Sequence, residues 1–90
     1  MLQRQDYVEL VLKFSKLISK GKIDKFALTQ YQKMIEFTAE EMNLKTDYSL
    51  SLIELFDEAE KNHLDLEPVE HVYSMLRNMV LLQSFTKNLF

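Results

Sequence analysis

The sequence of 90 residues has no cysteine and no tryptophan, and it has one glycine and one proline. Without cysteine, neither a disulfide framework nor a thiolate metal site is possible, and nothing points to an oxidising compartment. So few turn-forming residues exclude a multi-stranded sheet, which needs a chain break about every 8 to 12 residues. We therefore expect an all-α protein.

Long apolar runs are also missing. The longest strictly apolar stretch, residues 79–82, is far shorter than the ~20 residues that span a bilayer. The N-terminal residues MLQRQDYVEL lack the apolar core of a signal peptide. We expect a soluble cytoplasmic protein without a membrane span, and a chain of this length forms one domain, residues 1–90.

The sequence does have apolar side chains at helical spacing in four segments. The i, i+3, i+4, i+7 pattern of amphipathic helices runs through residues 7–20, 24–42, 47–63 and 68–80. The connections are expected to be short, about residues 21–23, 43–46 and 62–67. Because short links make consecutive helices antiparallel neighbours, the sequence predicts an antiparallel up-down-up-down four-helix bundle.

Residues with capping preferences stand near the ends of these segments: Asp24, Thr46 or Asp47, and Pro68 at the starts, and Gly21 and Asn43 at the ends. The third segment is expected to turn these side chains inward: Tyr48, Leu52, Leu55, Phe56, Ala59 and His63. In the second segment Phe37 lies away from the apolar stripe and near the direction of Phe26, which predicts an exposed aromatic pair.

Charge is unevenly distributed along the chain, whose net charge is −3. Residues 1–45 hold eight basic and six acidic side chains, whereas residues 46–90 hold three basic and eight acidic ones. Seven acids make up an acidic cluster in which Lys61 is the one basic residue: Glu54, Asp57, Glu58, Glu60, Asp65, Glu67 and Glu70.

The acidic cluster has two explanations. It is either a docking surface for a cationic protein or a solvated face with acids placed favourably at the positive end of a helix dipole. The dipole explains Glu67 and Glu70. The four acids of the third segment, residues 54–60, have no evident structural role, so we expect them to bind a partner.

The sequence gives only weak indications of metal binding or catalysis. A metal site would have to draw on His63, Asp65, Glu67, Glu70 and His71, which match neither a HExxH motif nor an EF-hand. Without cysteine, and with no nucleophile beside an identifiable base, catalysis is not expected. We therefore expect no metal, no cofactor and no enzymatic activity.

Two further groups of residues are candidate binding surfaces. Apolar residues outside the main stripes would form a partner groove, a homodimer seam or additional core: Val8, Leu12, Met75, Leu81, Leu82 and Phe85. Lysines near the first connection form a basic patch: Lys13, Lys16, Lys20, Lys22 and Lys25. The acidic isoelectric point of about 5.3 and the lack of a recognition helix argue against nucleic-acid binding.

Four features follow one another within residues 7–82: a helix ending LVLKFSKLISKGKID, a second helix opening with Phe26 and Tyr31, the segment SLIELFDEAEK, and an acidic entry to the last helix. This arrangement resembles immunity proteins of the colicin D type. The resemblance implies a helical bundle that binds the nuclease domain of a toxin. In that family acidic side chains meet the toxin's basic tRNA-binding cleft in place of substrate phosphates, and the matching positions here are those of the acidic cluster.

The sequence thus predicts a toxin-neutralising immunity protein that covers a basic, tRNase-like nuclease domain with its acidic cluster. Two alternatives stay open. Immunity proteins against membrane-active bacteriocins are also helical bundles. A structural or regulatory homodimer without catalytic activity would associate through Val8, Leu12, Leu81 and Phe85.

Overall fold

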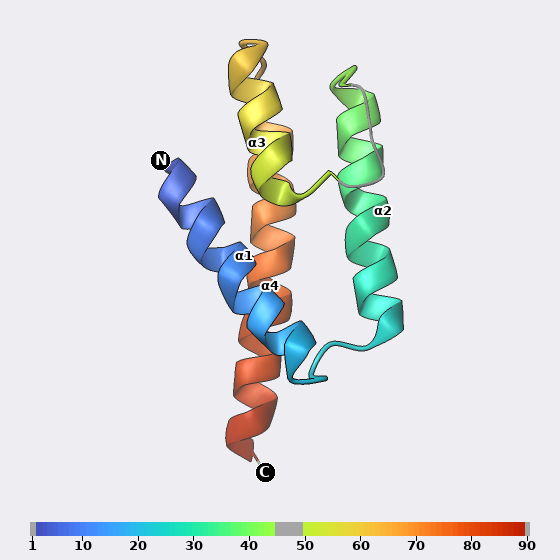
Figure 1. Ribbon diagram of the computed structural model, residues 1–90, viewed down its shortest axis with the longest axis vertical. Helices are drawn as coiled ribbons and strands as arrows, with labels where there is room; N and C mark the ends of the chain where they lie inside the picture. The colour runs from blue at the N-terminus through green and yellow to red at the C-terminus, as the bar shows by residue number, and fades with distance from the viewer. Residues whose placement is uncertain (1, 45–49, 90) are drawn as a thin grey trace.

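The computed structural model describes the backbone of residues 2–44 and 50–89 and, within this set, the side chains as far as Gln83. It contains the helices α1 (Arg4–Ser19), α2 (Lys25–Glu41), α3 (Leu52–Lys61) and α4 (Glu67–Leu89) (Figure 1). None of the described residues forms a strand. The prediction of an all-α fold with four helices is confirmed.

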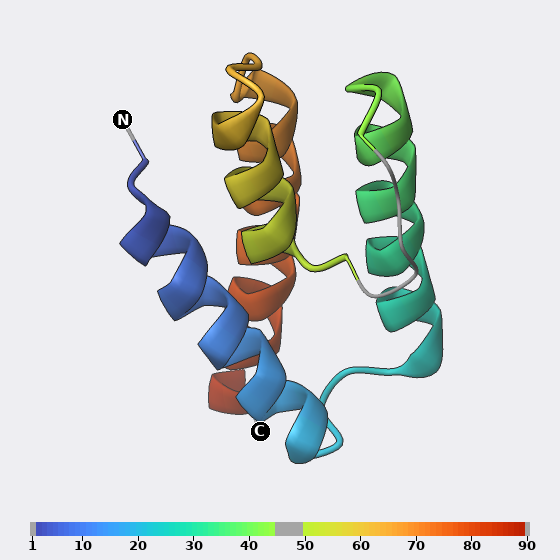
Figure 2. The same cartoon turned by 45° about the horizontal axis from the view of Figure 1, so that its top comes forward.

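The longest helix, α4, packs against each of the other three, and α1 packs along α3. In Figures 1 and 2, α1 and α4 run in one direction, whereas α2 and α3 run in the other. Antiparallel packing therefore holds for α1 with α3, for α2 with α4 and for α3 with α4. The directions depart from strict alternation at one step, from α2 to α3.

The length of the second connection explains this departure. Residues 42–51 separate α2 from α3, whereas the sequence pattern predicted a short link at residues 43–46. An extended chain spans up to ~3.3 Å per residue, whereas an α-helix rises ~1.5 Å per residue. The connection can therefore span a greater distance than the length of α3. The connection is thus long enough for α3 to start level with the middle of α2 (Figure 2).

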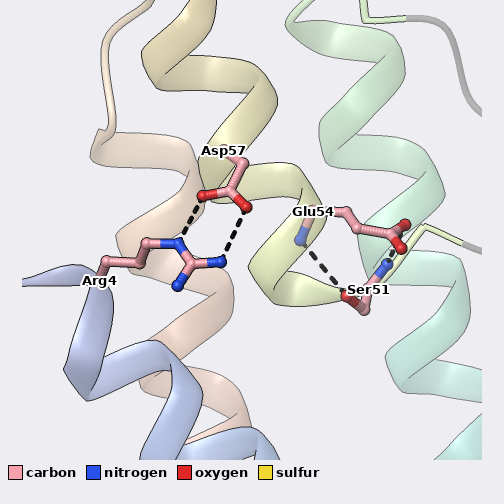
Figure 3. A network of polar contacts seen from close by, with 4 residues as sticks. All are labelled: Arg4, Ser51, Glu54 and Asp57. Atoms are coloured by element: carbon pink, nitrogen blue, oxygen red, sulfur yellow. Dashed lines mark hydrogen bonds and ion pairs between the residues drawn. The ribbon is translucent and has the colours of Figure 1, made fainter.

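Helix starts follow from side-chain caps. The Asp24 carboxylate accepts the Ala27 backbone N–H at 2.7 Å, as predicted. In α3 the capping residue is Ser51: its hydroxyl accepts the Glu54 N–H, and the Glu54 carboxylate accepts the Ser51 N–H, both at 3.3 Å (Figure 3). The predicted caps Thr46 and Asp47, and the inward position Tyr48, lie outside the described residues. Pro68 lies in the first turn of α4, after Glu67.

Helices α1, α2 and α3 end in the same turn. A residue with a left-handed backbone follows each helix: Gly21 (φ 68°), Asn43 (φ 56°) and His63 (φ 55°). In every case its N–H and that of the next residue donate to carbonyls of the last turn at 2.9 to 3.1 Å. The expected roles of Gly21 and Asn43 are confirmed.

The inward placement predicted for His63 is wrong. The apolar stripe of α3 continues in register from Ala59 to position 63, but the helix ends at Lys61. His63 therefore leaves the helical path, adopts a left-handed backbone and is exposed.

The core centres on Tyr7 of α1, which is fully buried. Its ring lies 4.6 Å from that of Phe56 on α3 and 5.0 Å from that of Tyr73 on α4. Helix α2 is joined to this group by the ring pair Phe14–Tyr31, with centroids 5.0 Å apart. The buried core consists of Tyr7, Leu10, Phe14, Tyr31, Ile35, Ala39, Leu52, Leu55, Phe56, Ala59, Val69, Val72, Leu76 and Val80.

Burial leaves the Tyr7 hydroxyl without a hydrogen-bond partner among the described residues. Burial, followed by the negative charge of Glu70, raises the pKa of Tyr7 to about 12. Burial also raises the pKa of Tyr31, although the Leu52 backbone lowers it in part.

Replacing Tyr7 with phenylalanine tests the unpaired hydroxyl. The substitution keeps the ring contacts and removes a buried polar group, so the free energy of unfolding in urea should rise by about 1 kcal/mol. A fall of that size would show that the hydroxyl has a stabilising partner.

The same variant should differ from the wild type in alkali. Tyr7 ionises near pH 10 in the unfolded chain and near 12 when folded, so its contribution to stability is complete below pH 10 and is lost between these values. Tyr7→Phe should flatten the decline in stability over this range.

Glycine at position 63 should stabilise the fold by about 0.5 to 1 kcal/mol, because it adopts positive φ without steric strain. The matched control is His71→Gly, which lies exposed inside α4 and should destabilise by about 1 kcal/mol. Chemical denaturation of both variants measures the difference. A destabilised His63→Gly variant would contradict the assignment of His63 as a strained helix end.

Candidate functional site

Helix α3 carries acidic side chains on its outer face and apolar side chains on the face that packs into the core. Leu52, Leu55, Phe56 and Ala59 are buried on one face. Away from this buried face, Glu54, Asp57 and Glu60 are exposed and Glu58 is half-buried. The helix therefore presents its carboxylates outward while its apolar face holds it against α1 and α4.

Two of these carboxylates have partners within the fold (Figure 3). The Glu54 carboxylate belongs to the capping box at Ser51. The Arg4 guanidinium donates to both Asp57 carboxylate oxygens, from Nε at 2.8 Å and from Nη2 at 3.1 Å, which links α1 to α3. Contrary to the expectation from the sequence, Glu54 and Asp57 thus have structural roles.

Glu58 and Glu60 are differently placed. Neither side chain forms an ion pair or hydrogen bond within residues 2–44 and 50–83. The hydrogen bond with Asp57 and its charge raise the pKa of Arg4, and the charge of Glu60 adds to this effect. Glu58 follows Glu54 by one turn and points about 100° away from Asp57 around the helix axis. After Arg4 and Lys61 are counted against the four acids, the outer face of α3 stays negative.

The rest of the acidic cluster lies at the start of α4. Asp65 accepts the Glu67 backbone N–H at 3.0 Å, which fixes the entry to the helix. Glu67 and Glu70 occupy the first turn, where the positive end of the helix dipole favours them. Glu70 is half-buried, whereas Asp65 and Glu67 are exposed. The structure therefore separates the acidic cluster into an α3 group and an α4 group.

A groove of about 640 Å³ lies between α2 and α4 on the described surface. It is lined by Gln30, Lys33, Met34, Phe37, Thr38 and Glu41 of α2 and by Asp65, Glu67, Pro68, His71, Val72 and Met75 of α4 and its entry. Phe37 is 60% exposed and Met75 is 40% exposed. The exposure predicted for Phe37 and Phe26 is confirmed, but the groove itself was not foreseen, because periodicity does not say which helices meet.

The structure also places the apolar residues outside the main stripes and the lysines of the basic patch. Leu12, Leu81 and Leu82 are exposed, Val8 is half-buried, and the side chain of Phe85 lies outside the described set. Four lysines of the basic patch gather around a smaller hollow of about 240 Å³ between α1 and α4: Lys13, Lys16, Lys20 and Lys22. Lys25 does not line it.

Metal ligation finds no support in this part of the chain. Within the described residues, no three His, Cys, Asp or Glu side chains lie close enough together to hold a metal ion. His63 and His71 are both exposed. No described helix combines the length and apolar character that crossing a membrane requires.

No family model, curated protein or solved structure matches this chain.

Charge reversal along α3 should distinguish carboxylates that stabilise the fold from carboxylates that do not. Glu54→Lys removes one half of the capping box and places a cation at the positive end of the helix, so it should destabilise the fold by about 1 kcal/mol. Glu58→Lys should change stability by less than about 0.5 kcal/mol. Thermal denaturation of the two variants measures the contrast, and equal losses would mean that Glu58 also supports the fold.

Proposed function

We propose that this chain is a non-catalytic inhibitor of the immunity-protein kind, which binds the cationic nuclease domain of a toxin through the acidic cluster. The observation that carries the proposal is the outer face of α3, which stays negative after its own ion pair and presents Glu58 and Glu60 without a hydrogen bond or ion pair to the residues that the structure describes. The resemblance of residues 7–82 to colicin D-type immunity proteins supports the same function.

The physical basis is competition for a basic cleft. A nuclease holds RNA phosphates with lysine and arginine side chains, and carboxylates on a rigid helix bind the same cations. Arg4 and the apolar face of α3 fix the helix before binding, so little conformational entropy is lost on association. In this proposal the α4 group extends the negative surface beyond α3.

The α3 group is tested by a double charge reversal, Glu58→Lys with Glu60→Lys. The matched control is Glu36→Lys with Glu40→Lys, which makes the same change in net charge on exposed positions of α2. The binding partner in this test is a basic nuclease domain of the colicin D type, and titration calorimetry at low salt gives both affinities. We expect a loss of roughly a hundredfold for the α3 variant and much less for the control.

Raising the salt concentration should weaken wild-type binding, because partly exposed charges are screened. The wild-type chain should also abolish nuclease activity in a 1:1 mixture. Equal losses in the two double variants would assign the effect to net charge and not to α3, and the absence of binding and protection by the wild type would refute the proposal.

The homodimer stays a second proposal. It is supported by the exposure of Leu12 and Leu81, which are 58% and 55% accessible on α1 and α4. Exposed leucines on two packed helices favour association with another apolar surface.

A further inference from the structure

The face formed by α2 and α4 carries both a projecting apolar side chain and a groove that has apolar residues among its polar and charged lining. Phe37 stands at the groove with 60% of its surface exposed. Met34, Val72 and Met75 line the same groove. A ring of this size on one copy thus has a matching cavity on another copy of the same face.

Charges flank Phe37 symmetrically along the helix. Lys33 precedes it by four residues and Glu41 follows it by four, so the three side chains lie along one ridge of α2. Both charged side chains line the groove, and neither forms an ion pair with the described residues. When such a ridge packs antiparallel against its own copy with Phe37 at the centre, each Lys33 meets the other copy's Glu41.

We propose that this face is the interface of a two-fold symmetric homodimer, in which α2 packs antiparallel against α2 of a second copy around Phe37. A two-fold interface uses the same patch on both subunits and must be self-complementary, and this face is complementary to itself in shape and in charge. Each Phe37 enters the other copy's groove beside Met34 and Met75. Two Lys33–Glu41 pairs then fix the register.

The rim of the groove favours a second copy further. Asp65 and Glu67 line the groove together with Glu41, which makes one end of it acidic. In the two-fold arrangement this end faces the second copy's Lys33, the one lysine among the described residues that line the groove. Glu54, Asp57, Glu58 and Glu60 do not line it, so the proposed dimer leaves the α3 group uncovered, whereas Asp65 and Glu67 belong both to the groove and to the acidic cluster.

Sedimentation equilibrium of the full chain across a micromolar concentration series tests the proposal. We expect a mass that rises from 10.7 kDa to twice that value. Phe37→Ala should weaken the dimer at least tenfold without changing the helix content or the melting curve of the monomer. The matched control, Phe26→Ala, removes a more exposed ring that does not line the groove, and it should have no effect.

The register is tested by two charge reversals. Lys33→Glu and Glu41→Lys should each weaken self-association by roughly tenfold to a hundredfold, because the symmetric interface contains each changed pair twice. An equal mixture of the two variants should form a heterodimer, since every facing pair is then opposite in charge. Glu36→Lys is the charge control on the same helix.

Three results would overturn the proposal. The first is a wild-type chain that is monomeric at every concentration. The second is a dimer that survives Phe37→Ala but is lost on Leu81→Glu, which assigns the seam to α1 and α4. The third is a mixture of the two reversal variants that stays monomeric, which excludes the antiparallel pairing of Lys33 with Glu41.

Discussion

The packing of Tyr7 against Phe56 and Tyr73 is the contact on which the rest of the structure depends, because it joins α1, α3 and α4 at one point. Burying the ring contributes about 1.5 to 3 kcal/mol, and each aromatic pair adds about 0.5 to 1.5 kcal/mol. An unpaired buried hydroxyl costs about 1 to 3 kcal/mol. The apolar contribution therefore exceeds the polar penalty, and the fold tolerates the buried hydroxyl.

This central contact decides which faces remain outside. With α1, α3 and α4 packed around Tyr7, the polar side of α3 lies on the surface and its carboxylates are held on a fixed helix. Helix α2 joins through the Phe14–Tyr31 ring pair. Its outer ridge, with Phe37, is consequently left exposed beside α4.

Much of the fold was predictable because its determinants are local. The caps at Asp24, Gly21 and Asn43 follow from residue type and position. The start of α3 was also encoded locally, as the capping box Ser51-x-x-Glu54, although Thr46 and Asp47 competed as caps in the sequence. His63 was predicted to point inward because the apolar stripe continues in register past the helix end. Its residue type does not indicate that the backbone at this position is left-handed.

The residues of the candidate site could be predicted from the sequence, but their contacts in the folded chain could not. The acidic cluster could be read from the sequence, but the pairing of Asp57 with Arg4 joins residues 53 positions apart. For the same reason, no local pattern foretold the groove between α2 and α4, since it depends on the direction of α2 and on the long connection that follows. Tertiary packing determined which carboxylates are engaged and which remain available.

The most direct test of the central claim is to map the binding surface of the wild-type chain by NMR chemical-shift changes on adding a basic nuclease domain of the proposed kind. We expect the largest changes at Glu58, Glu60 and residues 65–70, with the aromatic resonances of Tyr7 and Phe56 nearly unchanged. Changes concentrated on the lysines of α1, or no change at saturating nuclease, would contradict it.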